Sequence, residues 1–247
     1  AGWQLIEART ITGQEEGMFG WLSLNYQLGH FDSSNPNYIG VMDMGGASVQ
    51  IAFALQDTQA VDPDDLVELM VNGKKIQLFV HSFLGLGQTV FAYQFLNEAS
   101  CYANQYPLPS GLQGQGDATL CKNEVAKLIN DVHDVNQRVQ TALFENKPSA
   151  WFTIGGIEHL VQDKSIDLKS DFTPGEMFNR GNDVICSQTW SELVKTYPDN
   201  VYIHNYCLYP SYYYALIVNG YGISPELPIH LMPKDKSADW AMGVPLH

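Results

Sequence analysis

The chain has 247 residues, 45% of them hydrophobic, which is enough to bury the core of one large domain or two small ones. Acidic residues outnumber basic residues by 27 to 13, giving a formal net charge of −14, and the lysines and arginines are scattered. This excludes nucleic acid as the expected partner, because phosphate-backbone binding depends on clustered positive charge. No apolar run approaches the roughly 18 residues of a membrane span, so we expect none.

The residue pattern predicts alternating strands and helices, that is, an α/β protein. Thr12 and Glu15 form a capping box, which starts a predicted helix that ends near Gly29. Asn72-Gly73 is the commonest signal for a type I′ hairpin turn, here between strands at 66–71 and 74–79. The other predicted strands are Trp3–Ile11, Tyr38–Met44, Val49–Leu55 and Trp151–Ile154, and the other predicted helices are Gln88–Leu96, a long amphipathic helix over Val125–Leu143, one after the capping box Thr173–Glu176, and Tyr212–Val218.

The four cysteines, Cys101, Cys121, Cys186 and Cys207, lie in two pairs around polar loops. Three pairings are possible for four cysteines, and joining 101 to 121 and 186 to 207 closes the shortest loops. Disulfides suit a secreted or periplasmic protein, whereas four buried free thiols would suit a cytosolic one. We expect two local disulfides and a secreted or periplasmic location.

A loop of small residues, Gly45, Gly46, Ala47 and Ser48, follows Asp43 directly between two predicted strands. Because bulky side chains are absent, its backbone N–H groups could contact an anion such as phosphate. The aspartate could hold a hydrated divalent cation, and the serine could bind a water molecule. A structural hairpin turn capped by the aspartate would explain the same residues.

Two adjacent carboxylates, Glu15 and Glu16, lie in the first turn of the helix predicted after Thr12, where the helix dipole favours negative charge. Helix capping accounts for Glu15, which occupies the capping-box position. It does not require Glu16. That residue is therefore a candidate general base.

These two motifs, in this order in one chain, resemble the third and fourth conserved regions of the apyrase or nucleoside triphosphate diphosphohydrolase (NTPDase) family. The matching segments are Ile11–Asn25 (ITGQEEGMFGWLSLN) and Val41–Phe53 (VMDMGGASVQIAF). His81–Gly85, Trp151–Gly156 and Asp239–Gly243 resemble further motifs of the family, so the resemblance covers essentially the whole chain. The cysteine placement and the sequence at 154–156 look most like the small secreted bacterial members.

The family's first two conserved regions, a DxGSTGSR-like phosphate loop and a TAGMR-like segment, have no counterpart here. The resemblance implies an α/β fold with a mixed sheet flanked by helices. This would be one lobe of an actin-like, ribonuclease H-like fold, in the superfamily of acetate kinase, sugar kinases, heat-shock ATPases and actin. Residues 1–239 would form the C-terminal lobe, and residues 240–247 would start the return to a missing N-terminal lobe. The chain also lacks an initiator methionine, so we expect that processing or truncation has removed an upstream part.

The resemblance also implies that the complete protein hydrolyses nucleoside tri- and diphosphates to monophosphates with a divalent cation. Ca²⁺ or Mg²⁺ is expected, with Mn²⁺ as a further candidate. Glu16 would take a proton from the attacking water, which Ser48 and Gln50 would position. Asp43 and Glu16 would bind the metal through water. The groups expected to bind phosphate are the backbone N–H groups of Gly45, Gly46, Ala47 and Ser48.

By the same resemblance the nucleobase would lie loosely between His159 and Tyr202. Because any base can stack on an aromatic face, purines and pyrimidines should both be accepted. Trp21 and Trp240 look like the family's tryptophans near this site, although Trp21 is equally well placed for core packing. Other candidates for the aromatic role are Tyr206, Tyr209 and Tyr212 to Tyr214.

Two alternatives stay open. The chain could be a noncatalytic nucleotide-binding or structural lobe of an actin-like protein. It could also belong to an exopolyphosphatase-like enzyme of the same superfamily, which would have no use for the nucleobase site. Because half of a phosphate site would be missing, we expect the isolated chain to be nearly inactive.

Overall fold

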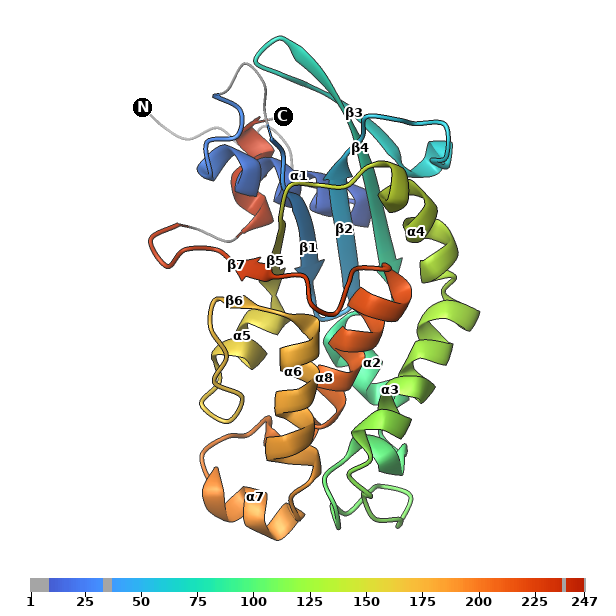
Figure 1. Ribbon diagram of the computed structural model, residues 1–247, viewed down its shortest axis with the longest axis vertical. Helices are drawn as coiled ribbons and strands as arrows, with labels where there is room; N and C mark the ends of the chain where they lie inside the picture. The colour runs from blue at the N-terminus through green and yellow to red at the C-terminus, as the bar shows by residue number, and fades with distance from the viewer. Residues whose placement is uncertain (1–8, 33–36, 237–238, 247) are drawn as a thin grey trace.

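A mixed sheet of seven strands runs through the described part of the chain, in the order β3-β4-β2-β1-β5-β7-β6 (Figure 1). The structure is a computed structural model, and it describes residues 9–32, 37–236 and 239–246. The strands are β1 (Gly40–Met44), β2 (Ser48–Ala54), β3 (Leu66–Val71), β4 (Lys74–Leu84), β5 (Trp151–Gly155), β6 (Asp171–Phe172) and β7 (Ile229–Leu231).

Strand pairing aligns three polar residues across the middle of the sheet. β1 pairs with β5 in parallel and with β2 antiparallel, and β2 pairs with β4 antiparallel. This register places Gln50 of β2 opposite Asp43 of β1 on one side and opposite Ser82 of β4 on the other. Side chains that are directly opposite in adjacent strands lie close together, so these three share one region of the sheet.

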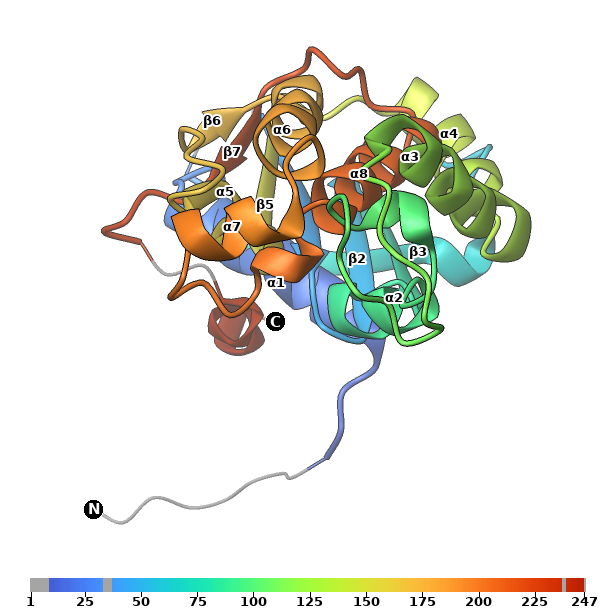
Figure 2. The ribbon, with the colours of Figure 1, turned by 90° about the horizontal axis from the view of Figure 1, so that it is seen from below.

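Helices cover both faces of the sheet (Figure 2). α1 and the 3₁₀ helix η7 lie on one face, and the larger helical layer lies on the other. The α-helices are α1 (Gly13–Gln27), α2 (Gln88–Gln94), α3 (Ala118–Lys127), α4 (Val135–Glu145), α5 (Gly156–Gln162), α6 (Pro174–Gly181), α7 (Trp190–Thr196) and α8 (Leu208–Tyr214). The 3₁₀ helices are η1 (Pro63–Asp65), η2 (Ala99–Cys101), η5 (Ile203–Asn205) and η7 (Trp240–Leu246), and the π-helical turns are η3 (Leu128–Val132), η4 (Asn182–Cys186) and η6 (Ala215–Gly220).

Alternation along the strands assigns the core residues to two hydrophobic clusters, one on each face. Val41, Ala52 and Val80 belong to the cluster under α1, whereas the hydrophobic residues next to them in sequence belong to the cluster under the other helices. Asp43, Gln50 and Ser82 each lie two residues from one of these, and therefore on the face that α1 covers. The α1 side of the sheet thus changes from apolar to polar toward the small-residue loop, Gly45–Ser48.

Glycines allow α1 to approach the sheet closely. A Cβ at Gly13 would lie 2.2 Å from the Oγ of Ser82, and one at Gly17 would lie 2.9 Å from Val80. On the opposite side of the helix, a Cβ at Gly243 of η7 would lie 2.0 Å from the carbonyl oxygen of Phe19. α1 is therefore held between the sheet and η7 by contacts that leave no room for a side chain.

Several local predictions are confirmed. Both hydrogen bonds of the Thr12 capping box are present, and the helix that it starts ends at Gln27. The box at Thr173 likewise starts α6. Asn72 and Gly73 have φ values of 51° and 74°, as a type I′ turn requires. The disulfides join Cys101 to Cys121 and Cys186 to Cys207.

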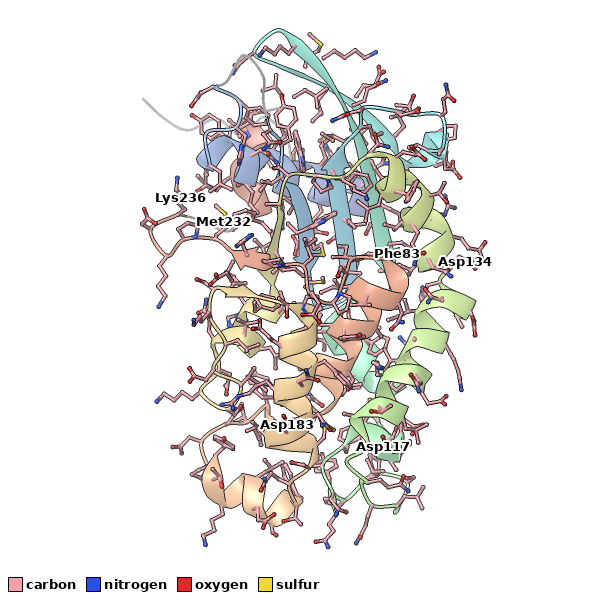
Figure 3. The ribbon with its side chains drawn as sticks, viewed as in Figure 1. Phe83, Asp117, Asp134, Asp183, Met232 and Lys236 are labelled. Carbon is pink, nitrogen blue, oxygen red and sulfur yellow. A yellow bond between two sulfur atoms is a disulfide. The ribbon has the colours of Figure 1, made fainter. Side chains whose placement is uncertain are left out.

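The long helix predicted over Val125–Leu143 is wrong. α3 ends at Lys127, η3 follows, and α4 starts at Val135 after Asp134, which has a left-handed φ of 51° (Figure 3). Aspartate tolerates this conformation better than most residues, and a single left-handed residue breaks a helix while its apolar periodicity continues.

The first predicted strand, Trp3–Ile11, lies mostly outside the described residues, and Arg9 to Ile11 are not in a strand. β4 is longer than predicted, since it continues from Phe79 to Leu84. Within the described part of the chain, no helix is long and apolar enough to cross a membrane.

Candidate active site

The small-residue loop is fixed through its carbonyl groups. The carbonyl oxygens of Gly45, Gly46 and Ala47 all accept hydrogen bonds from backbone N–H groups of the segment 85–90, at distances between 2.9 and 3.2 Å. These donors lie in the turn after β4 and at the start of α2. α2 is thereby attached to the loop on the side that faces the helical layer.

The N–H groups of Gly45, Gly46 and Ala47 remain available. Among the described residues, none of the three donates a hydrogen bond. Gly46 and Ala47 are exposed and Gly45 is half-buried, so this side of the loop is open to solvent. Successive free N–H groups in a turn form a site for an anion, and packed side chains do not cover it.

Replacement of Gly87 by alanine should test this loop anchorage. A Cβ there would lie 2.3 Å from the backbone N and C of Ala47, although the φ of −61° itself suits alanine. The clash is with backbone, so we expect a loss of roughly 1–3 kcal/mol in the free energy of unfolding, measured by denaturant titration. The matched control is Gly46→Ala, whose Cβ would lie 3.4 Å from Thr89 and should change stability by less than about 0.5 kcal/mol. Equal stability of the Gly87→Ala variant and the wild type would contradict the described contact.

The two neighbouring glutamates of α1 have different surroundings. Glu15 accepts two hydrogen bonds from Arg9, at 2.7 and 2.9 Å, and one from the backbone N–H of Thr12. These bonds, Arg9 first, lower the pKa of Glu15 to about 2. Glu16 is half-buried and accepts a hydrogen bond from Gln50 at 2.9 Å. Burial raises its pKa above the ordinary value, so Glu16 has the greater affinity for a proton.

The side chain of Gln50 is a hydrogen-bond centre on the polar end of the sheet. It is 1% exposed, and its Nε2 lies 2.9 Å from Glu16, 2.8 Å from the Oγ of Ser48 and 3.0 Å from the Oγ of Ser82. Its Oε1 is buried and has no partner among the described residues. Glu16 and Ser48, two of the predicted catalytic residues, are therefore both hydrogen-bonded to the third, Gln50.

Asp43 lies beside this group in a buried position. It is 7% exposed, and among the described residues its side chain makes no hydrogen bond. Burial, followed by the charges of Glu16 and Asp239, raises the pKa of Asp43 to about 7. Three carboxylates whose charges repel one another would be stabilised by a cation.

The donor set suits a hydrated cation. In the described part of the chain, no group of three or more His, Cys, Asp or Glu side chains is placed to hold a metal directly. Asp43 nevertheless keeps oxygen lone pairs that no donor among the described residues uses. Such oxygens can accept hydrogen bonds from the water molecules that surround a bound Ca²⁺ or Mg²⁺ ion. The residues present therefore fit a cation held mainly through water and substrate oxygens.

A cavity of about 750 Å³ lies next to the loop and is lined by both predicted nucleobase residues, His159 of α5 and Tyr202. Both side chains are exposed. Gln88 and Gly156 line the same cavity, and Gln88 also donates its backbone N–H to Gly45 of the small-residue loop. The cavity therefore adjoins the start of α2, which is hydrogen-bonded to the small-residue loop.

Among the competing tyrosines, Tyr206 and Tyr209 also line this cavity. Tyr212 and Tyr213 do not, because both belong to α8 and are fully buried in the core. The hydroxyl of Tyr213 donates to the side-chain oxygen of Gln88 at 2.6 Å, which directs the amide nitrogen of Gln88 away from the core.

The two tryptophans differ in position. Trp21 has no exposed surface, packs against Phe31 and Tyr38, and donates its ring N–H to the carbonyl of Ile39, before the start of β1. Asp43 lies near the other end of that strand, so the position of Trp21 agrees with the core-packing interpretation, and its role near the site stays a prediction. Trp240 is half-buried in η7 against Gly20 of α1, next to Asp239.

Two residues of this site were not named as site residues from the sequence. Ser82 belongs to the motif His81–Gly85, but only the β2–β4 register places it opposite Gln50. Asp239 is the first residue of the motif Asp239–Gly243, and only the packing of η7 on α1 brings its charge near Asp43.

Comparison with solved structures gives the class of the fold. The chain aligns over 97% of its length with a nucleoside triphosphate hydrolase from Neospora caninum, covering 64% of that chain with a TM-score of 0.70 and 16% identity. It aligns over 96% of its length with a Ppx/GppA family member from Aquifex aeolicus, covering 62% of that chain with a TM-score of 0.51 and 14% identity. These alignments agree with the predicted actin-like fold class, and the mixed sheet flanked by helices is confirmed.

The model of the GDA1/CD39 (nucleoside phosphatase) family matches residues 4–110 of the chain. Ectonucleoside triphosphate diphosphohydrolase 3 of Homo sapiens is 28% identical over 96% of this chain and 55% of the human protein. Ectonucleoside triphosphate diphosphohydrolase 1 of Mus musculus is 26% identical over 97% of this chain and 57% of the mouse protein. The chain therefore spans about half the length of the curated relatives it matches.

Proposed function

We propose that the complete protein hydrolyses nucleoside tri- and diphosphates to nucleoside monophosphates by direct attack of water on the terminal phosphoryl group. The observation that carries this proposal is that Gln50 donates hydrogen bonds to both Glu16 and Ser48, on the strand that directly follows a loop with free N–H groups. The names of the relatives support the substrate class.

Within this proposal Glu16 is the general base. Burial raises its proton affinity, and its hydrogen bond from Gln50 fixes one carboxylate oxygen while the other can accept a proton. Ser48 and Gln50 position the water. Phosphoryl transfer needs little covalent catalysis by the protein. Positioning of the water and neutralisation of phosphate charge therefore account for most of the catalysis.

The small-residue loop would bind phosphate oxygens through the N–H groups of Gly45, Gly46, Ala47 and Ser48. Asp43 would hold a divalent cation through water, with Glu16 nearby. Bound Ca²⁺ or Mg²⁺ would neutralise phosphate charge, which reconciles a net charge of −14 with a polyanionic substrate.

His159 and Tyr202 would contact the nucleobase through their ring faces. Their exposed positions in one cavity favour loose stacking over hydrogen-bonded recognition, so little discrimination between bases is expected. Inorganic polyphosphate would make no use of that wall.

We further infer that residues 1–239 act as the C-terminal lobe and that 240–247 lead toward an N-terminal lobe with the second phosphate loop. The motivation is that relatives nearly twice as long are matched. The two disulfides support a secreted or periplasmic location, where an oxidising environment maintains them.

Phosphate release by the complete protein tests the proposal. ATP, ADP, AMP and inorganic polyphosphate would be compared, each with Ca²⁺, with Mg²⁺ or with a chelator. We expect turnover of ATP and ADP but not AMP, and its loss with the chelator. Turnover of polyphosphate alone would indicate a polyphosphatase, and nucleotide binding without phosphate release would indicate a noncatalytic lobe. The isolated chain, assayed alongside, should be nearly inactive.

A further inference from the structure

We propose that Ser82 is a positioning residue that holds the amide of Gln50 in the orientation required by Glu16 and Ser48. This inference rests on the proposed function. It extends that function to a residue outside both the segment that carries Glu16 and the small-residue loop. It starts from a mismatch in the hydrogen bonds of Gln50.

The amide nitrogen of Gln50 has more acceptors than hydrogens. Nε2 carries two hydrogens, whereas Glu16, Ser48 and Ser82 offer three acceptor oxygens within 3.0 Å. The amide oxygen is buried and has no partner among the described residues. An unpaired buried acceptor costs roughly 1–3 kcal/mol, so this orientation persists only because the nitrogen side is strongly favoured.

Ser82 contributes to that preference from the neighbouring strand β4. Its Oγ reaches Gln50 across the β2–β4 pairing and is itself half-buried. Gly13, at the start of α1, leaves the space that the hydroxyl group fills, since a Cβ at Gly13 would lie 2.2 Å from it. The hydroxyl therefore has little room to move and remains a fixed acceptor.

Loss of this acceptor would loosen the amide. The terminal torsion of glutamine is broad, and without Ser82 the amide could rotate its oxygen toward the vacated position. Rotation would remove the hydrogen bonds to Glu16 and Ser48 together and would turn a negative oxygen toward a carboxylate. A smaller fraction of the protein would then hold the water-positioning groups in place.

Kinetics of the complete protein with ATP test this role. We expect Ser82→Ala to lower kcat roughly 3- to 10-fold, the equivalent of one hydrogen bond, with KM changed less than about two-fold. In a Gln50→Met background, Ser82→Ala should lower kcat by less than about two-fold further, because Ser82 acts through Gln50. A wild-type kcat for Ser82→Ala, or losses that multiply in the double variant, would overturn the inference.

Thr153→Val is the matched control. Thr153 is a buried hydroxyl residue of the same sheet, and it donates to the carbonyl of Met42 without contact to Gln50. It should keep kcat at the wild-type level even if stability falls.

A second measurement does not depend on turnover. The side-chain amide protons of Gln50, observed by NMR in the ¹⁵N-labelled protein, should exchange with solvent at least about ten-fold faster in Ser82→Ala than in the wild type or Thr153→Val. Unchanged exchange would overturn the positioning role. Faster exchange in a protein that releases no phosphate from ATP would instead uphold the positioning of Gln50 and reject the proposed function.

Discussion

Replacement of Glu16 by glutamine is expected to lower kcat for ATP in the complete protein by roughly 100- to 10,000-fold, the usual contribution of a general base. Glutamine has the same shape and can still accept the hydrogen bond from Gln50 through its amide oxygen, so the local geometry should persist. It cannot take a proton from water. KM should change little, because the loss is confined to the transition state.

The neighbouring glutamate supplies the control for this experiment. Glu15→Gln removes an equal charge one residue away, but Glu15 is committed to Arg9 and the helix cap. It should lower thermal stability and leave kcat near the wild-type value. Because burial raises the pKa of Glu16, the acid limb of the wild-type pH–rate profile should lie above the ordinary glutamate pKa of 4.5. Normal turnover by Glu16→Gln would rule out base catalysis by this residue.

Asp43→Asn is expected to make the protein more stable at pH 8 in the presence of a chelator. The pKa of Asp43 is about 7 in the folded protein and near 3.8 when unfolded, so folding favours the protonated form. That stabilisation is complete below the unfolded pKa and is lost as pH rises through 7. Between pH 5 and pH 8 the wild type should lose on the order of 3 kcal/mol in unfolding free energy from this group, and the variant should not.

Denaturant titrations at the two pH values would measure this difference. Asp171→Asn, which alters an exposed carboxylate of β6, should follow the wild type at both. The same Asp43→Asn variant should lose phosphate release, since it lacks the charge proposed to hold the cation. A variant whose stability falls with pH as steeply as the wild type would contradict the buried, like-charged environment of Asp43.

The parts of the site that follow one another in sequence could be predicted, because local chemistry determines them. The Thr12 capping box fixes where α1 starts, and it thereby separates the roles of Glu15 and Glu16. The open N–H groups of the small-residue loop could be predicted for the same reason, because glycines between two strands leave the backbone uncovered by side chains.

The parts that depend on strand register could not be predicted. Ser82 and Asp239 join the site only through pairing of β4 with β2 and packing of η7 on α1, which involve distant segments. The junction at Asp134 was missed for a different reason. The apolar positions on both sides keep a helical period, and hydrophobicity alone does not report one left-handed residue.

Core packing alone is enough to explain the position of Trp21. An indole ring has a large apolar area, and its most favourable place is the core, where its N–H donates to the carbonyl of Ile39. His159 and Tyr202, which are exposed and polar at their tips, remain available to a ligand.

The glycine contacts of α1 have a consequence for tolerance to substitution. Side chains that separate a helix from a sheet can change rotamer and absorb small displacements, but a backbone seated directly against Ser82, Val80 and η7 has no such compliance. A shift of η7 against Phe19 would therefore carry the whole helix with it, and the carboxylate of Glu16 would move relative to β2 by a similar amount. Amino-acid substitutions in α1 should therefore be tolerated only at the few positions whose side chains face solvent.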